Sequence, residues 1–479
     1  MKTQIVALFV CVVFFACKEK KLAELNISQS IGYVNNRPNV IVILIDDAGY
    51  VDFGFMGSKD LETPNIDALA KDGIVFSDAH VSATVCAPSR AGIMTGKYQQ
   101  RFGFEANDTG DLESGDVGLS DDVVTMADVF KENNYNTIAI GKWHLGASPS
   151  DHPNKRGFNE FYGFLGGGRS YFPTKKVNDK TQMQRNGNAV ELTEYLTDAL
   201  GNESVRFVEE NKSKPFFMYL AFNAVHTPME AKEEDLEKYK NHSRQTLAAM
   251  TWSLDENIGK LRNKLKELNL LDNTLIYFLS DNGGAHNNQS SNGNLKGWKG
   301  NKFEGGQRVP FVISWPKMLK GNQKYDGLAS SLDIFTTSIS AANITKNEDL
   351  TLDGVDLMPF LKNQKSGNPH EVLYWRKLDE SAVRMGDYKL IALKNFDYAM
   401  YDLSKDEIEM NDVSEIETKK SQELLYKLTE WESKMSDPLW REGEEWEEVT
   451  YHIHQQLMKN KPALYKAPNH KNQITLKNK

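Results

Sequence analysis

A run of seven residues near the start of this chain most restricts its possible folds. Asn39-Val-Ile-Val-Ile-Leu-Ile45 is apolar after its first residue, rich in β-branched side chains, and followed at once by Asp46 and Asp47. A strand that is apolar at successive positions has no face left for water, so it must be covered on both sides. This is typical of a strand in a parallel sheet.

The rest of the chain continues the alternation of strands and helices as far as about residue 368. This pattern predicts an α/β fold with a large, mostly parallel sheet and helices on both faces. After residue 368, short strand-like segments follow one another and indicate a smaller antiparallel sheet packed with a helix. We predict helices at 63–73, 125–134, 192–210, 246–268, 328–342 and 421–435, and strands at 39–45, 137–140, 215–222, 274–280, 310–315, 372–376, 381–385, 388–393 and 399–403.

The N-terminal segment has the features of an export signal. Lys2 precedes an apolar run from Ile5 to Ala16, which is too short to anchor the chain across a bilayer. Ala16-Cys17 is similar to a bacterial lipobox, so Cys17 is a candidate for lipid attachment. We expect residues 1–17 to be a lipoprotein-type signal peptide, 18–37 a tether, 38–368 the catalytic domain and 369–479 a smaller C-terminal domain. The expected location is the periplasm or the outer membrane and cell surface, with plain secretion as the alternative.

Charge excludes one class of partner. The chain of 479 residues has a net charge of -9 and a pI near 5.7, which gives no reason to expect nucleic-acid binding. An anionic substrate would therefore need a local basic pocket. No later segment is long and apolar enough to cross a membrane, so membrane contact is expected only through a lipid on Cys17. The last forty residues are polar, and the sequence does not indicate their role.

Cys86 is the third and last cysteine of the chain, and the other two lie in the leader. Inside the folded body it has no partner for an intrachain disulfide. It stands in a turn-like context, Cys86-Ala-Pro-Ser-Arg90, and a single cysteine in such a setting is a candidate nucleophile. The alternative is a buried thiol that acts as a small apolar side chain.

Acidic and amide side chains follow two of the predicted strands. Asp46 and Asp47 come after the first strand, and Asp281 and Asn282 come after the strand at 274–280. Binding sites in open α/β sheets form beyond the carboxyl ends of strands, and oxygen ligands suit Ca²⁺ or Mg²⁺. Asp-Asp and Asp-Asn-Gly-Gly are also common turn sequences, so the alternative for either pair alone is a turn that binds no metal.

These motifs resemble those of the type I, formylglycine-dependent sulfatases of the alkaline phosphatase superfamily. Cys86-x-Pro-Ser-Arg90 matches the activation signature, and Asp46, Asp47, Asp281 and Asn282 match the metal ligands in order and context. The similarity extends through Gly141-Lys-Trp-His-Leu-Gly146, Asn223-Ala-Val-His-Thr-Pro228 and Lys296-Gly-Trp-Lys-Gly-Asn-Lys-Phe-Glu-Gly-Gly306, and it runs from residue 40 to about 315.

The resemblance implies an alkaline-phosphatase-like fold and hydrolysis of sulfate esters, most plausibly on a sulfated polysaccharide or oligosaccharide. In the family a maturing enzyme oxidises the cysteine, here Cys86, to formylglycine. Its hydrated aldehyde is the nucleophile and also a metal ligand, with Ca²⁺ as the expected ion and Mg²⁺ as the alternative. Arg90, Lys142 and Lys299 would balance the charge of the nucleophile and the sulfuryl group. His226 is the expected general acid, and His144 the expected base that regenerates the aldehyde. Lys296 and Lys302 are rivals of Lys299 within the same segment.

Residues that would recognise the sugar are harder to identify from sequence. His152, Arg169, Tyr171 and Arg308 are candidates, and Arg156 is a further one. Arg169 and Tyr171 follow Gly166-Gly-Gly168 in what reads as a flexible loop, where an arginine could bind an anionic group and a tyrosine could stack on a sugar. The alternative is a surface loop with a solvated arginine. Algal galactans, rhamnose sulfates and glycosaminoglycans all remain possible.

Three other functions stay open at this point. A phosphonate or phosphate monoester hydrolase of the same superfamily could use the same nucleophile. A non-catalytic glycan-binding protein at the cell surface would keep an intact thiol at residue 86 and bind no metal. A thiol enzyme would need an unmodified, ionised Cys86 near a histidine.

Overall fold

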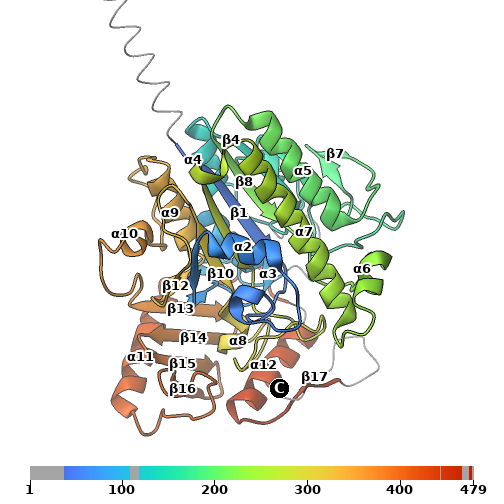
Figure 1. The fold of residues 1–479 in the computed structure, drawn as a ribbon. Helices are drawn as coiled ribbons and strands as arrows, with labels where there is room; N and C mark the ends of the chain where they lie inside the picture. Colours follow the sequence, from blue (N-terminus) through green and yellow to red (C-terminus); the bar gives the residue numbers. More distant parts are fainter. Residues whose placement is uncertain (1–36, 108–117, 443, 466–473, 477–479) are drawn as a thin grey trace, which may run out of the picture.

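The computed structural model describes residues 37–107, 118–442, 444–465 and 474–476 (Figure 1). The expected signal peptide, and the expected tether apart from Arg37, therefore lie outside the described residues, and the domain boundaries remain predictions. Within the described part, no helix combines the length and the apolar character needed to span a membrane.

A ten-stranded sheet forms the centre of the molecule, in the order β11-β2-β10-β9-β1-β8-β4-β5-β6-β7. Its five middle strands, from β9 to β5, are parallel, and β10 and β6 pair antiparallel on either side of them. The strands are β1 (Asn39–Ile45), β2 (Ile74–Phe76), β4 (Asn136–Lys142), β5 (Glu160–Phe164), β6 (Gln184–Arg185), β7 (Asn188–Ala189), β8 (Phe216–Ala221), β9 (Thr274–Ser280), β10 (Phe311–Ser314) and β11 (Gln323–Tyr325). The predicted mostly parallel sheet is confirmed.

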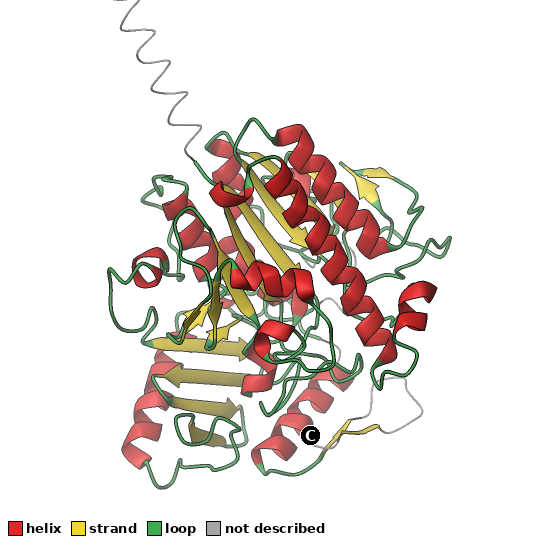
Figure 2. Ribbon diagram, in the orientation of Figure 1, coloured by secondary structure: helices red, strands yellow, loops and turns green. Residues whose placement is uncertain are grey.

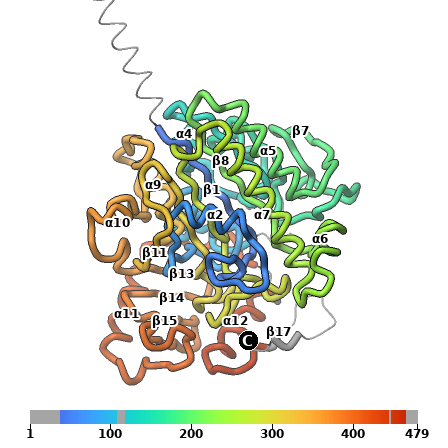
Figure 3. The backbone as a smooth tube through the Cα atoms, in the orientation of Figure 1, coloured from blue at the N-terminus to red at the C-terminus, as the bar shows by residue number. Residues whose placement is uncertain are grey.

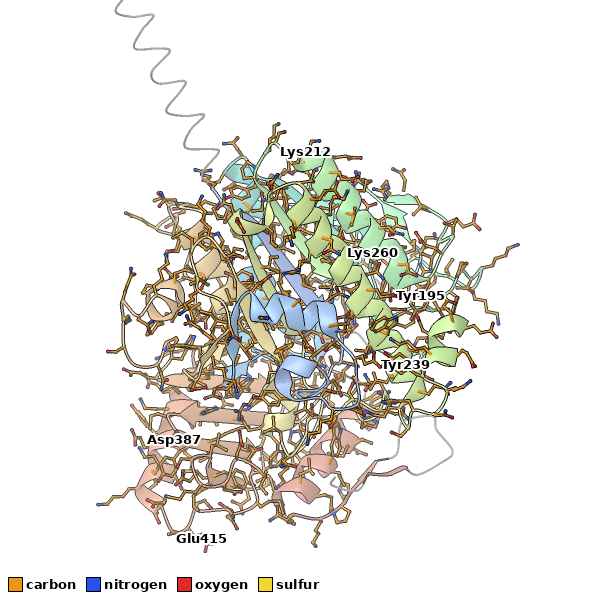
Figure 4. All side chains as sticks on the ribbon, in the orientation of Figure 1. Tyr195, Lys212, Tyr239, Lys260, Asp387 and Glu415 are labelled. Atoms are coloured by element: carbon orange, nitrogen blue, oxygen red, sulfur yellow. The ribbon has the colours of Figure 1, made fainter. Side chains whose placement is uncertain are left out.

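Helices cover both faces of this sheet, as the apolar run in β1 requires (Figure 2). Val40, Val42 and Leu44 belong to one core cluster, with α3, α4 and α9, whereas the intervening isoleucines belong to another, with α2, α5 and α7. Side chains fill the space between sheet and helices (Figure 4). The helices are α2 (Pro64–Lys71), α3 (Cys86–Thr95), α4 (Met126–Glu132), α5 (Leu196–Asn211), α6 (Glu233–Lys238), α7 (Gln245–Glu267), α8 (Glu304–Gln307), α9 (Asp333–Ala341) and α10 (Met358–Leu361).

The predicted helix at 328–342 begins later than expected. Ala329 and Ser330 form a short strand, β12, paired with β3 (Ala79–His80), and α9 starts at Asp333. The Asp333 carboxylate accepts the backbone N–H of Ser330 at 2.8 Å. The first residues of the predicted helix are therefore in a strand, because they pair with a strand that is remote in the sequence.

A second, four-stranded antiparallel sheet follows, as predicted, and lies beside the main sheet (Figure 3). The helices α11 and α12 flank it, and α12 lies within the last forty residues, for which the sequence indicated no role. The elements are β13 (Val372–Lys377), β14 (Glu380–Met385), β15 (Tyr388–Leu393), β16 (Tyr398–Asp402), α11 (Thr418–Glu432), α12 (Glu444–Met458), β17 (Ala463–Tyr465) and β18 (Ile474–Leu476).

Candidate active site

The strand register brings the predicted acidic residues together. Ile45 pairs with Ser280, so Asp46 and Asp281 lie side by side just beyond the carboxyl ends of β1 and β9. Ligand atoms of Asp46, Asp47, Cys86 and Asp281 all lie within 4.8 Å of one another. Asp47 has a positive φ of 62°, and side chains of Asn288 and Ser290 donate to its carbonyl oxygen at 3.0 and 2.9 Å.

This cluster has the chemistry of a cation site. The carboxylates and the amide oxygen of Asn282 are hard oxygen donors, which suit Ca²⁺ or Mg²⁺. Asn282 Nδ2 donates to Asp47 Oδ1 at 2.7 Å, whereas its buried Oδ1 has no hydrogen-bond partner among the described residues. Burial, with the neighbouring charge of Asp46, raises the pKa of Asp281 to about 6. The residues therefore fit a divalent cation, which would satisfy the amide oxygen and offset the repulsion.

Cys86 is the first residue of α3 and is 1% exposed. Its Sγ lies 3.5 Å from Asp46 Oδ1 and 3.8 Å from Asp47 Oδ1, so residue 86 faces the acidic cluster. The amide side chain of Asn107 accepts the backbone N–H of Ala87 at 3.0 Å. Burial raises the pKa of the thiol, and a buried neutral thiol is not the thiolate that a thiol enzyme needs.

Three cations balance the three carboxylates. Arg90 donates to Asp281 Oδ2 at 2.9 and 2.7 Å and to the carbonyl oxygen of Lys142 at 3.0 Å. Lys142 Nζ contacts Asp46 Oδ2 at 2.6 Å, and Lys299 Nζ contacts Asp47 Oδ2 at 2.9 Å. A divalent cation added to this set would make the pocket positive within an acidic protein, as an anionic substrate requires.

The two predicted histidines lie against the glycine loop of residues 166–168. A Cβ at Gly167 would stand 2.7 Å from His144 Nε2, and one at Gly168 would stand 3.3 Å from His226 Nδ1. His226 Nδ1 donates to the carbonyl oxygen of Thr227 at 2.6 Å, and its Nε2 lies 3.7 Å from Asp47 Oδ2. Burial lowers the pKa of His226 to about 3, with a further contribution from Lys142. Burial and the positive charge of Lys142 also lower the pKa of His144.

The candidate sugar-binding residues have structural partners elsewhere. Tyr171 is fully buried, and its hydroxyl donates to the carbonyl oxygens of Asn223 and His226 at 2.6 and 2.8 Å. It therefore shapes the loop that carries His226, which argues against the expected stacking on a sugar. Arg169 is 6% exposed, and its Nε and Nη1 donate to the carbonyl oxygens of Ser170 and Thr181, so it is not a solvated surface arginine; its contact with a substrate stays a prediction.

The other candidates lie in local contacts of their own. Arg308 forms an ion pair with Glu407 at 2.7 Å and donates to the carbonyl oxygen of Ser77. His152 bonds to Gln184 at 3.2 Å. Arg156 donates to the carbonyl oxygens of Ser120 and Val123. None of these contacts involves the acidic cluster.

Several supporting residues escaped the sequence analysis. Glu230 accepts the hydroxyl of Ser170 at 2.8 Å and the backbone N–H of Tyr171 at 2.7 Å, and so fixes the glycine loop. Asn107, Asn288 and Ser290 support Cys86 and Asp47 as described above. Each is an ordinary polar residue in a polar segment, so no local signal distinguishes it. The run of three glycines is the one sequence signal for the close approach of residues 166–168 to His144 and His226.

Comparison with known families supports the resemblance drawn from the motifs. The model of the family described as Sulfatase matches residues 38–344. A second model, described as N-sulphoglucosamine sulphohydrolase, C-terminal, matches residues 297–437. The first match covers more than half of the chain and spans every residue that we assigned to the metal site and the catalytic groups.

Known proteins give the same result. The chain is 31% identical over 379 residues to N-acetylgalactosamine-6-sulfatase of Mus musculus, covering 74% of this chain and 71% of that protein. It is 31% identical to steryl-sulfatase of Homo sapiens, and the match covers 71% of this chain and 72% of that protein. The crystal structure of Ps i-CgsB superposes with a TM-score of 0.81 at 38% identity, covering 88% of this chain and 99% of that one; the same protein is also solved with k-i-k-neocarrahexaose. The expected alkaline-phosphatase-like fold is confirmed. This chain belongs to the sulfatase family and is a sulfuric ester hydrolase.

Proposed function

We propose that this enzyme removes sulfate groups from a sulfated galactan oligosaccharide, with Cys86 converted to formylglycine and Ca²⁺ bound by Asp46, Asp47, Asp281 and Asn282. The observation that carries the chemical part is the position of residue 86, whose side chain lies 3.5 Å from Asp46 within an all-oxygen cluster lined by Arg90, Lys142 and Lys299. The substrate class rests on the likeness to Ps i-CgsB, a protein solved with a neocarrahexaose.

Each charged residue of the site can be given a role in the reaction. The cation and the formylglycine would together supply a nucleophilic hydroxyl at residue 86 beside a concentrated positive charge. Arg90 orients residue 86 and Asp281 through its planar guanidinium. Lys142 and Lys299, which contact Asp46 and Asp47, offset the negative charge of the sulfuryl oxygens in the transition state.

Hydrolysis of a sulfate ester leaves negative charge on the bridging oxygen, so a proton donor must stand near the leaving group. His226 fits this role in its doubly protonated form, in which Nδ1–H donates to the carbonyl oxygen of Thr227 and the second proton, on Nε2, faces the site. In the substrate-free protein the ring is neutral and Nε2 carries no proton, so the negative charge of the bound sulfate ester must favour protonation of His226. His144 lies against the same glycine loop, with a buried Nδ1 that has no partner among the described residues. We assign it to proton removal from residue 86 when sulfate departs.

Export belongs to the same proposal. A galactan polymer must be cut into oligosaccharides outside the cytoplasm, and the apolar leader that ends in Ala16-Cys17 would place the enzyme there. A lipid on Cys17 would hold it at the outer membrane or cell surface, and a formylglycine-generating enzyme would be its partner during maturation.

A comparison of substrates tests the proposed function. Sulfate release should be fastest on sulfated galactan oligosaccharides, slower on glycosaminoglycan oligosaccharides, and at least about tenfold faster for an aryl sulfate than for the matching aryl phosphate. The measurements are sulfate release by ion chromatography and kcat/KM for the two aryl esters. A preference for the phosphate ester or a phosphonate would contradict the proposal, as would binding of galactan without any turnover.

The acid role of His226 predicts a dependence on the leaving group. The change His226→Ala should lower kcat by about 10²- to 10⁴-fold for a sugar sulfate, whose alkoxide needs a proton, and far less for a nitrophenyl sulfate. Rates for a series of esters with leaving groups of different pKa measure this. His242→Ala is a control, because that histidine bonds to the carbonyl oxygen of Asp60 on the surface. An equal loss for good and poor leaving groups would rule out the acid assignment.

A further inference from the structure

Three lysines spaced three residues apart have different surroundings in the segment 296–306. Lys299 reaches Asp47 and has 19% of its side chain exposed. Lys296 and Lys302 are buried, at 6% and 1% exposed. The sequence could not separate them, because all three lie in one glycine-rich stretch. Their partners show that the two buried lysines tie this segment to the C-terminal part of the chain.

Lys296 is held by groups that come late in the sequence. Its Nζ donates to the carbonyl oxygen of Glu409 and to Asn460 Oδ1, both at 2.7 Å. Asn460 lies just beyond the end of α12, and its Nδ2 donates to the carbonyl oxygen of Met410 at 2.8 Å. That second bond fixes which side of the amide faces Lys296. A buried ammonium group needs such acceptors.

Lys302 is held on both sides. Its backbone N–H donates to His454 Nε2 at 3.0 Å, and its Nζ donates to Thr84 Oγ1 at 3.3 Å. The backbone N–H of Gly300 donates to the carbonyl oxygen of Thr84 at 2.7 Å. Thr84 stands two residues before Cys86, so the segment with Lys299 is joined to the irregular stretch that leads to residue 86.

His454 is suited to accept a hydrogen bond at a fixed position. It is fully buried in α12, and burial lowers its pKa to about 3, so its ring is neutral. Its Nδ1 lies 2.8 Å from the carbonyl oxygen of Thr450, which must receive the ring proton. Nε2 then carries a lone pair directed at the N–H of Lys302.

The backbone N–H of Lys299 donates to the carbonyl oxygen of Gly284 at 3.2 Å, and the contacts of Lys296 and Lys302 add to this restraint at the two ends of the loop. Gly297 and Gly300 flank Lys299 with φ values of 81° and 91°, and glycine adopts these at no steric cost but also restrains the chain weakly. A catalytic ammonium group displaced by about 1 Å can lower the rate by about 10²-fold. The loop therefore depends on contacts outside itself to keep Lys299 Nζ at 2.9 Å from Asp47.

We propose that His454 and Asn460 are positioning residues that hold Lys299 in the active site, acting through Lys302 and Lys296. The inference rests on the sulfate-binding role of Lys299 in the proposed function. It assigns a task to the last forty residues of the chain: α12 and the residues just after it hold the two ends of the loop whose middle residue, Lys299, contacts Asp47.

The test compares variants of the full-length mature enzyme. His454→Ala removes the acceptor for Lys302, and we expect kcat/KM for an aryl sulfate to fall about 10- to 100-fold, with a similar rise in the inhibition constant of inorganic sulfate. His454→Gln should recover most of both losses, because its side-chain oxygen can occupy the position of Nε2. A purely structural role would lower the melting temperature without changing sulfate affinity per folded molecule.

Leu424→Ala supplies the matched control. Leu424 is fully buried in α11 and packs in a different cluster, against β14 and β15, so the change should lower stability but keep kcat/KM within about twofold. The proposal is overturned if His454→Ala loses no more activity than Leu424→Ala, or if His454→Gln is as impaired as His454→Ala.

Two further variants keep the outcome clear. If His454→Ala does not fold, Asn460→Ala removes one acceptor of Lys296 at an exposed position, and an unchanged inhibition constant for sulfate would overturn the proposal. Lys299→Ala separates the two hypotheses. If it retains full activity, the proposed role of Lys299 fails; if it is inactive while His454→Ala is normal, only the positioning role fails.

Discussion

Replacing Cys86 with alanine is expected to lower sulfate ester hydrolysis by about 10⁴-fold or more, with little change in stability. The substitution removes the thiol group, without which Cβ of residue 86 cannot be oxidised to the aldehyde, and no other described side chain occupies the same position between Asp46 and Asp47. Alanine suits this part of α3, where Ala87 and Ala91 already pack. The measurement is kcat/KM on an aryl sulfate, beside the melting temperature.

Ile93→Val is the matched control, since Ile93 is a fully buried residue of the same helix. It should cost about 1 kcal/mol of stability and leave turnover per folded molecule unchanged. Mass spectrometry of the peptide from Thr84 to Arg90 completes the test. An active enzyme with an unmodified thiol at residue 86, or full activity in Cys86→Ala, would refute the proposed nucleophile.

Removing divalent cations is expected to lower activity by about 10³-fold or more and to reduce the melting temperature. Without the ion, Asp46, Asp47 and Asp281 crowd one buried site, and the amide oxygen of Asn282 has no partner among the described residues. A cation that binds only the folded state adds about 2.7 kcal/mol at a hundred times its Kd. Back-titration with Ca²⁺ and Mg²⁺, followed by activity and melting temperature, identifies the ion; we expect Ca²⁺ to restore more.

The matched variants are Asp281→Asn and Asp255→Asn. Asp281 belongs to the acidic cluster, so its change should weaken the stabilisation by Ca²⁺. Asp255 is also buried, but its carboxylate accepts the backbone N–H groups of Asn65 and Ile66 at the start of α2, so its change should lower stability and leave the response to Ca²⁺ intact. The metal site is refuted if neither the activity nor the melting temperature changes when a chelator or Ca²⁺ is added.

The central architecture could be read from residue patterns because local chemistry imposes it. The apolar run of β1 cannot be solvated on either face, and the structure buries all seven of its residues. The strand at Thr274–Ser280 has the same character and pairs with it in register. That pairing brings together Asp46 and Asp281, which lie 235 residues apart in the chain. Residue 86, the acidic cluster and the cations Arg90, Lys142 and Lys299 all belong to motifs that are visible in the sequence.

Features that depend on contacts between remote segments could not be read in this way. Tyr171 looks like a loop residue in sequence but is buried by Asn223 and His226, and the start of the helix at 328–342 is lost to pairing with β3. Lys296, Lys299 and Lys302 share one local context, and only the positions of Asp47, His454 and Asn460 separate their roles. Apolar periodicity and turn residues are properties of the chain itself. Burial and hydrogen-bond partners are properties of packed surfaces, so they become defined only when distant segments meet.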